Sequence, residues 1–499
     1  MPKPSTMDSG GGHHGRIARN SFYIFLSRFV EFGAGLAIVV LVANHFGVRE
    51  FGRFSFIRAV AFVLGPLMMF GTMRIVVREI SVDKTRTAEI LRAALVLNVV
   101  MSAATAVFAA GVPLMFRLEG PAVTTSIYLA LLTQSCLAMI STINAGFIAH
   151  EIANFAALVS ITNRVLVIAA LVVVIGLQKD LATLFGGILC ANFVGLMTAL
   201  LVLKLSRILS DAKGMLWANM KFLFRESYPI AAVVFLVQGY TYLNTFLLRY
   251  VHDNWHVAMF EASQRIILPL SLISTSILLA FVPMLSRLGK DPQTHEQLLK
   301  VYASTLKFFI LLTLPACAVV ALFAEPIILL IYNEDFIQAA LSLRILIWTI
   351  VPLFANGLLN FLLTALYKQR LLLISNVACF VVNAVFGVLL VKEFGVAGVS
   401  LAALLAFVIL FGVNYHFVNV HLGCAQLIPM TVVPALTTLL FYGAASFFVA
   451  RPVYRLVGVM LYLLVYVVIL WLARIISWEE LRRLVDSQRR QPRVAGSRP

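Results

Sequence analysis

Charged residues are scarce in this sequence. Lys, Arg, Asp and Glu together make up 12% of the 499 residues, against 61% for hydrophobic residues, whereas a soluble domain usually has about a quarter of its residues charged. This balance excludes a soluble globular protein. Apolar stretches of membrane-spanning length, about 20 residues, recur from Asn20 to Arg474. They do not alternate in polarity as barrel strands do, so they predict transmembrane helices, which close their backbone hydrogen bonds internally.

Several kinds of functional motif are also missing. The 5 cysteines lie mostly inside apolar stretches, so no disulfide framework is visible. The sequence has no Gly-x-x-x-x-Gly-Lys-Ser/Thr loop, no His/Cys/Asp cluster with metal-ligand spacing, and no loop large enough for a catalytic domain. We therefore expect no enzyme, no metal site and no cofactor.

The positive charge of the chain does not indicate a nucleic-acid partner. The formal net charge is +17, but the basic residues sit mainly in loops and in the C-terminal tail. Basic segments next to membrane spans attract anionic lipid head groups. Anionic membrane lipids are therefore the expected partner of these segments.

Fourteen apolar stretches are candidate spans. The separators before Tyr367 and Val396 are the weakest, so twelve spans remain the alternative. Most of the 39 Lys and Arg residues fall on one side of the membrane when both termini are placed in the cytoplasm. Because Lys and Arg are enriched in cytoplasmic loops, we expect both termini to be cytoplasmic.

The spans divide the chain into successive parts. We predict an all-α polytopic membrane protein of about 14 transmembrane helices, with two six-helix lobes in a parallel pseudo-repeat plus two C-terminal helices. The parts are a basic flexible N-terminus (1–19), an N-lobe with spans 1–6 (20–203), a cytoplasmic amphipathic linker (204–227), a C-lobe with spans 7–12 (228–418), spans 13 and 14 (419–475), and a basic cytoplasmic tail (476–499).

A weak internal repeat supports the two lobes. A shift of 207 residues places Arg58 on Arg265 and Glu31 on Gln238, and it also superposes the first two spans on the seventh and eighth. Lobes of six spans enter the membrane in the same direction and are related by an axis along its normal. Such a pair of lobes leaves a cleft between them.

Charges inside the membrane are the most informative residues, because they are costly there and usually face a cavity. Arg164 lies near the middle of its span, which predicts a cavity role, with a buried structural arginine as the alternative. Arg28 and Glu31 lie three residues apart on one helix face and can neutralise each other. Glu31 is a candidate ion-coupling site, and Arg28 is a candidate cavity cation.

Arg58 and Arg265 occupy matching spans, so we expect them to face one cleft, although either could instead reach outward to lipid head groups. The cations inside the spans are mainly arginines rather than lysines. A guanidinium group binds phosphate oxygens in a bidentate way that an ammonium group does not. This preference indicates an anionic, phosphorylated substrate.

The beginning of the chain resembles a known family. The opening Asn20-Ser21-Phe22, the loop from Phe46 to Ser55 and the following Arg58 are similar to the N-terminal signature of bacterial polysaccharide flippases. The resemblance implies the fold of the multidrug/oligosaccharidyl-lipid/polysaccharide exporter superfamily. It also implies an O-antigen (Wzx-type) flippase that moves undecaprenyl-diphosphate-linked oligosaccharide across the inner membrane by alternating access.

The cationic cavities of that family match the character of Arg28, Arg58, Arg164 and Arg265, which are therefore the expected substrate-binding residues. The lipid-linked oligosaccharide is the expected substrate. Glycan polymerase and chain-length proteins are candidate partners, and we expect a monomer in the bacterial inner membrane.

Two alternatives stay open. A cation-coupled multidrug antiporter of the same superfamily would need an acidic rather than an arginine-rich cavity. A membrane glycosyl polymerase or ligase would need a large periplasmic loop with catalytic residues, and the largest outer loop is predicted around Arg249 to Gln264.

Overall fold

The computed structural model describes residues 11–116, 120–208, 215–288, 295–366 and 368–423, with short pieces between 433 and 469. Within these ranges the protein is helical and has no strand, which confirms the predicted all-α fold class. The α-helices are α1 (Gly11–Met69), α2 (Thr72–Val82), α3 (Thr87–Phe108), α4 (Val112–Met115), α5 (Pro121–Ala149), α6 (Ala153–Gly176), α7 (Leu181–Leu205), α8 (Leu216–Val251), α9 (Asn254–Leu288), α10 (His295–Leu322), α11 (Ala324–Ile331), α12 (Ala339–Leu346), α13 (Ile350–Ala365) and α14 (Gln369–Leu422).

Two of these helices each contain two spans. α1 has non-helical backbone at Gly47 (φ 76°), and α14 has it at Gly395 (φ 50°). Positive φ is accessible to glycine because it has no Cβ. The chain can therefore change direction at Gly47 and Gly395 without an intervening loop. The weak separator predicted before Val396 is the Gly395 break. Spans 13 and 14 and the basic tail fall mostly outside the described residues.

Helix α8 begins within the predicted linker. The amphipathic segment from residue 215 to 224 is the first part of α8, which continues without interruption to Val251. Leu223 is fully buried, and the Phe224 ring stacks on Phe70 with centroids 4.7 Å apart. The segment is therefore helical, as its pattern predicts, but it is not separate from the seventh span.

The outer loop predicted around Arg249 to Gln264 is shorter than the sequence suggests. α8 ends at Val251 and α9 begins at Asn254, which leaves only His252 and Asp253 between them. Arg249 belongs to α8, and the polar residues Glu261 and Ser263, in the first turns of α9, are buried.

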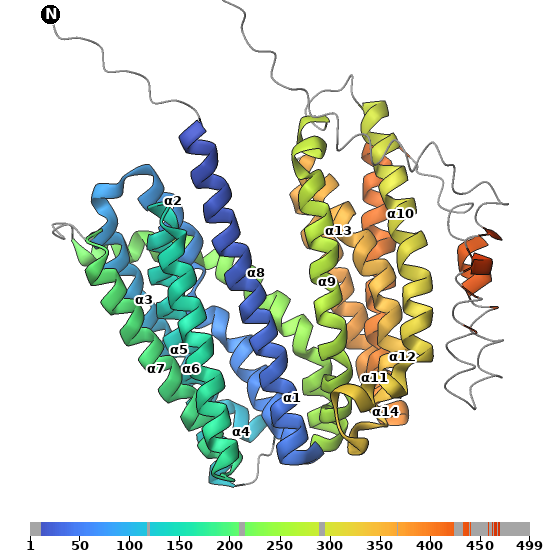
Figure 1. Ribbon diagram of the computed structural model, residues 1–499, viewed down its shortest axis with the longest axis horizontal. Helices are drawn as coiled ribbons and strands as arrows, with labels where there is room; N and C mark the ends of the chain where they lie inside the picture. The colour runs from blue at the N-terminus through green and yellow to red at the C-terminus, as the bar shows by residue number, and fades with distance from the viewer. Residues whose placement is uncertain are drawn as a thin grey trace, which may run out of the picture. The chain divides into compact units, whose positions relative to one another are not determined.

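The helices form two compact units. The first comprises residues 1–265, 331–336 and 387–399, and the second comprises 266–330, 337–386 and 400–499. This division by contacts does not follow the lobes 20–203 and 228–418, which stay a prediction. In the first unit α5 packs against α1, α3 and α7, and α6 packs against α1 and α7 (Figure 1). In the second unit α10 packs against α12 and α13.

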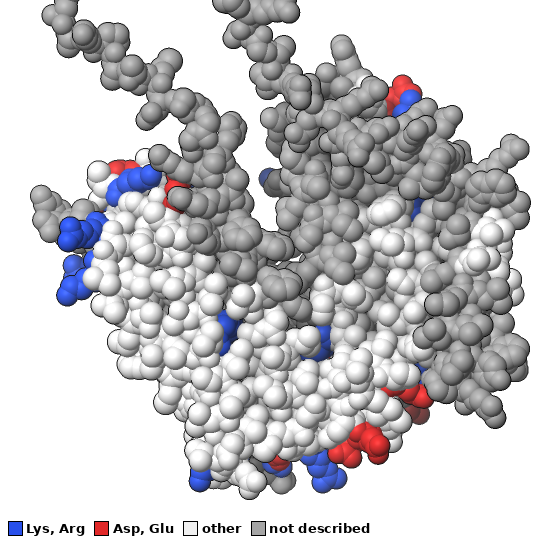
Figure 2. All heavy atoms as spheres, in the orientation of Figure 1, with Lys and Arg blue, Asp and Glu red and all other residues white. Residues whose placement is uncertain are grey.

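Many large apolar side chains point outward, as expected for helices surrounded by lipid. On α6, Leu158, Val165 and Val172 are each more than half exposed. In Figure 2 most of the described surface is uncharged, and charged side chains gather toward the ends of the helices. In the part of the chain that the structure describes, nine helical segments are long and apolar enough to cross a membrane.

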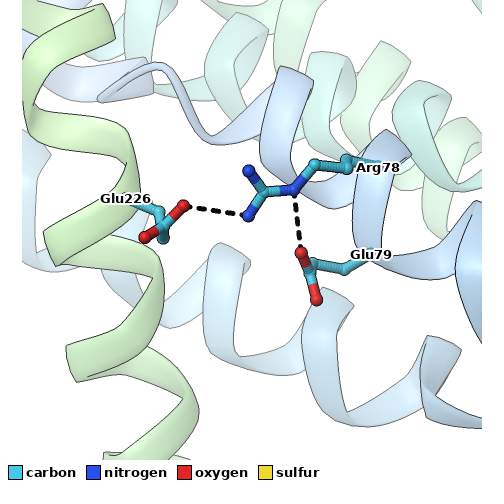
Figure 3. A network of polar contacts seen from close by, with 3 residues as sticks. All are labelled: Arg78, Glu79 and Glu226. Atoms are coloured by element: carbon cyan, nitrogen blue, oxygen red, sulfur yellow. Dashed lines mark hydrogen bonds and ion pairs between the residues drawn. The ribbon is translucent and has the colours of Figure 1, made fainter.

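An ionic network ties α2 to the start of α8 in the first unit (Figure 3). Arg78 donates from Nη2 to Glu226 on α8 and from Nε to Glu79, both at 2.9 Å. The Arg78 side chain is about half exposed, at 51%. Exposed ion pairs contribute little to stability, roughly 0–1 kcal/mol, so the buried Leu223 and the Phe70–Phe224 stack are the stronger attachment of this segment.

Gly52 on α1 allows a close helix approach that can be tested. A Cβ at Gly52 would lie 1.8 Å from the backbone oxygen of Asn254, whereas a Cβ at Gly35 meets no described atom within 4 Å. Gly52→Ala should therefore lower the unfolding free energy by about 1–3 kcal/mol through overpacking. Gly35→Ala should leave it unchanged or raise it by up to about 1 kcal/mol, because alanine is the better helix former. Thermal unfolding of the purified variants measures both, and equal melting temperatures would contradict the packing.

Candidate anion site

Arg58 and Arg265, which the sequence pairs through its repeat, lie in one cluster in the first unit. Arg58 comes from the second half of α1 and Arg265 from α9. Both guanidinium groups lie near Tyr242 on α8, and the two cations are close enough to repel each other. Three helices thus bring two arginines close to one tyrosine.

Arg265 has a buried acidic partner on its own helix. Its Nη2 donates to Glu261 Oε2 at 2.9 Å, and the two side chains are 12% and 1% exposed. The other carboxylate oxygen, Oε1, accepts from Thr245 Oγ1 at 2.6 Å. The spacing of four residues puts both groups on one face of α9. Glu261 is therefore fully bonded, and it neutralises one of the two cations.

Arg58 has no acidic partner of this kind among the described residues. Its guanidinium carbon lies 5.6 Å from the Phe54 ring centroid and 5.3 Å from that of Phe62, one turn on either side. Such cation–π contacts contribute about 0.5–2 kcal/mol. The Phe62 ring in turn stacks on Tyr242. The Arg58 Nε is buried and has no hydrogen-bond partner in the described structure.

The charge of this cluster is unbalanced. Arg58 and Arg265 carry two positive charges, and Glu261 carries one negative charge. Buried charges are normally paired because desolvation is costly, and arginine stays protonated. An excess cation with an unpartnered donor is the arrangement expected of a site that binds an anion.

A short segment after α11 closes one side of the cluster. The buried Tyr332 hydroxyl donates to the Ala262 carbonyl on α9 at 3.3 Å, and the Tyr332 and Phe336 rings both pack on Phe51 of α1. Asn44 holds this segment through the Ile331 carbonyl and the Asn333 amide, both at 3.2 Å. These contacts hold α1 and α9 side by side at the level of the arginines.

Arg164, another predicted site residue, is not part of this cluster. Arg164 lies on α6 and is half-buried, with Ala157 and Leu171 one heptad away on the same face both buried. Its neighbour Asn163 donates to Asn192 at 3.0 Å, and the Asn163 Oδ1, which could accept from the arginine, has no hydrogen-bond partner in the described structure. Arg28 and Glu31 belong to α1, but their side chains lie outside the described residues.

Sequence reasoning missed Glu261 as well as Tyr242 and Thr245. The sequence pattern places Glu261 in an outer loop, where a spacing of four residues from Arg265 has no meaning. On a helix that spacing is the signal that could have found it. Tyr242 and Thr245, three residues apart on α8, carry no charge and give no comparable signal in an apolar stretch.

The fold and the buried cationic cluster define a multi-pass membrane protein of the transporter class. The model of the polysaccharide biosynthesis protein family matches residues 17–289, more than half of the chain, and a second model, MatE, matches residues 229–389. The protein belongs to the polysaccharide biosynthesis protein family.

Relatives and solved structures agree with this assignment. The chain is 22% identical over 411 residues to a probable low-salt glycan biosynthesis flippase, Agl15, of Haloferax volcanii, covering 81% of this chain and 84% of that protein. It is similar in fold to the lipid II flippase MurJ in an inward closed conformation, with a TM-score of 0.67, 14% identity and coverage of 91% and 98%. It is also similar to an inward-facing multidrug resistance MATE family transporter of the MOP superfamily, with a TM-score of 0.62, 16% identity and coverage of 79% and 94%.

The two arginines should differ in their effect on stability. Arg265→Gln leaves the buried Glu261 carboxylate without its cation, which should cost about 3–5 kcal/mol of unfolding free energy. Arg58→Gln removes a charge that Arg265 repels and that contacts the faces of Phe54 and Phe62, so it should cost at most about 0.5–2 kcal/mol, the range of its cation–π contacts. Thermal unfolding of the two variants, with the exposed Arg53→Gln as control, measures the difference. Equal destabilisation by Arg58→Gln would mean that Arg58 has a structural role.

Proposed function

We propose that the protein is a flippase for lipid-linked oligosaccharide. In this proposal it moves undecaprenyl-diphosphate-linked oligosaccharide from the cytoplasmic to the periplasmic leaflet of a bacterial inner membrane by alternating access. The diphosphate is held by Arg58 and Arg265, while the polyprenyl chain remains in lipid. The observation that carries the proposal is the buried arginine pair with more positive than negative charge.

The chemistry of the pair suits a diphosphate. Guanidinium groups form strong, often bidentate, hydrogen bonds to phosphate oxygens, and the Arg58 Nε has no other partner in the described structure. Electrostatic attraction is stronger at a buried site than in water. Two guanidinium groups that lie near the same tyrosine, Tyr242, can each take one phosphate of the same diphosphate.

The remaining predicted site residues have roles in this proposal too. The half-buried Arg164 on α6 and Arg28 on α1 supply further positive charge along the path of the head group, and Glu31 is a candidate ion-coupling residue. The protein works as a monomer with both termini in the cytoplasm. Glycan polymerase and chain-length proteins are its candidate partners.

The comparisons support the proposal through the character of the relatives. The Haloferax relative is a probable low-salt glycan biosynthesis flippase, and MurJ is a lipid II flippase. The MatE match to residues 229–389 and the MATE neighbours favour a second candidate, a cation-coupled multidrug antiporter. The net positive charge of the Arg58–Arg265 cluster disfavours cationic drugs at that position.

A glycosyl polymerase or ligase is a weaker candidate than either transporter. Its catalytic residues would need a large outer loop. The outer loop predicted to be the largest, around Arg249 to Gln264, contains only His252 and Asp253 between its two helices. Agl15 and MurJ are described as flippases rather than enzymes.

Transport in proteoliposomes tests the proposal. The substrate is a short-chain polyprenyl-diphospho-disaccharide with a fluorescent label on the sugar, and an impermeant quencher reports how much label is in the outer leaflet. The protein should translocate this lipid, and Arg58→Gln and Arg265→Gln should each slow translocation at least about tenfold. If both arginines hold one diphosphate, the double variant should lose less than the sum of the single losses, because residues that share a ligand are not additive.

Two controls make the outcome specific. Arg53→Gln changes an exposed arginine of the same helix, with a 47% exposed side chain, and should transport normally. Ethidium loaded into the same vesicles should not be moved. Transport of ethidium without translocation of the glycolipid would contradict the proposed flippase function and favour the drug antiporter.

A further inference from the structure

Glu261 occupies the binding position that the proposed substrate needs. Its carboxylate is bonded to Arg265 at 2.9 Å and to Thr245 at 2.6 Å, and it is 1% exposed. We infer that Glu261 is an internal counter-anion, which releases Arg265 by taking up one proton from water when a diphosphate diester binds. This inference rests on the proposed function and deepens it, because it states the charge of the substrate that the site accepts.

The charge balance supplies the first argument. With Glu261 ionised, the described cluster of two arginines and one carboxylate has a net charge of plus one. A diphosphate diester, with a lipid on one phosphate and a sugar on the other, carries two negative charges at neutral pH. Bound to the cluster as it stands, it would leave one uncompensated negative charge in an apolar interior, which is costly. Protonation of Glu261 raises the charge of the cluster to plus two, which is equal and opposite to the charge of the diphosphate.

Competition for Arg265 supplies the second argument. A phosphate on the Arg265 guanidinium would lie beside the carboxylate that already holds its Nη2. Two anions that share one cation favour protonation of the weaker acid, and the carboxyl group is a weaker acid than a diphosphate diester. The proton therefore goes to Glu261. No covalent bond forms or breaks in the substrate.

Thr245 can serve both states of Glu261. When the carboxylate is paired with Arg265, the Thr245 hydroxyl donates to Glu261 Oε1. A hydroxyl can also accept a hydrogen bond, so the protonated carboxyl group can donate to Thr245 after it leaves Arg265. The neutral carboxyl group thus keeps a partner although it is fully buried.

The groups that face Glu261 are few in the described structure. Arg58 on α1 attracts its charge, as Arg265 does, and Tyr242 on α8 and Tyr332 after α11 lie beside the same arginines. The two tyrosines are neutral at neutral pH, and the arginines do not lose their protons there. Among these groups Glu261 is the one that can change its charge on binding.

Calorimetry in two buffers tests the inference. The purified protein in detergent is titrated with a short-chain polyprenyl-diphospho-N-acetylglucosamine in buffers with different ionisation enthalpies, and the difference in heat gives the protons taken up. We expect about one proton per bound diphosphate at neutral pH, and a Kd that rises up to about tenfold per pH unit. A polyprenyl-phospho-mannose, which carries one negative charge, should bind without proton uptake and with a flat pH dependence.

Substitutions of Glu261 show whether this residue takes up the proton. Glu261→Gln should reduce the uptake from about one proton to near zero and flatten the pH dependence, whereas Glu261→Asp should keep both. Glu325→Gln is the matched control, since Glu325 also pairs with an arginine, Arg344, at 2.6 Å but lies in the second unit; it should retain the uptake. If Glu261→Gln does not fold, the wild-type titrations with the two probes and Glu261→Asp still carry the test.

The results of these titrations distinguish a failure of the inference about Glu261 from a failure of the proposed flippase function. Diphosphate binding without proton uptake, or equal uptake in wild type and Glu261→Gln, overturns the role of Glu261 and leaves the flippase intact. No binding of the diphosphate probe to the wild-type protein overturns the proposed function and the inference with it. Proton uptake with the diphosphate alone, lost in Glu261→Gln, supports both.

Discussion

The central physical constraint in this protein is the burial of two guanidinium groups within an apolar helical bundle. An isolated charge in such an interior is too costly to keep, so each arginine needs neighbours that replace water. Arg265 has Glu261 on its own helix, and Arg58 has the aromatic faces of Phe54 and Phe62. The compensation is incomplete, because one positive charge is left over and the Arg58 Nε has no partner in the described structure. Burying an unpaired positive charge is unfavourable, and an anionic lipid head group bound between the arginines would compensate it under the proposed function.

The packing around the cluster explains how its members are held. α1 and α9 approach so closely that only glycine fits at position 52, against the Asn254 backbone. The short connection through His252 and Asp253 fixes α8 beside α9, and therefore Tyr242 and Thr245 beside Glu261. Tyr332, held by a segment that Asn44 fixes, bonds to Ala262 on α9. The contacts that Tyr332 and its neighbours make in this region are aromatic packing and a backbone hydrogen bond.

The sequence predicts the helical fold well because membrane spans are long and their signal is strong. The sequence also predicts the pairing of Arg58 with Arg265, because the internal repeat appears when the sequence is aligned with itself at a shift of 207 residues. Glu261 is not identified because a polar run from Arg249 to Gln264 has the composition of a loop, although it is the end of one helix and the start of the next. Tertiary packing decides that question, since Glu261 is buried and bonded to Arg265 and Thr245. The helix that begins after residue 215 shows the same limit, because its amphipathic pattern does not reveal that it continues into a span.

The most direct test of the account is a structure of the protein with a short polyprenyl-diphospho-disaccharide, determined by electron cryomicroscopy with a bound antibody fragment. The account predicts phosphate oxygens about 2.7–2.9 Å from guanidinium nitrogens of both Arg58 and Arg265, with the Glu261 carboxyl group turned away from Arg265. A diphosphate bound elsewhere, for example among basic residues at the helix ends, with the Arg265–Glu261 pair unchanged, would contradict it.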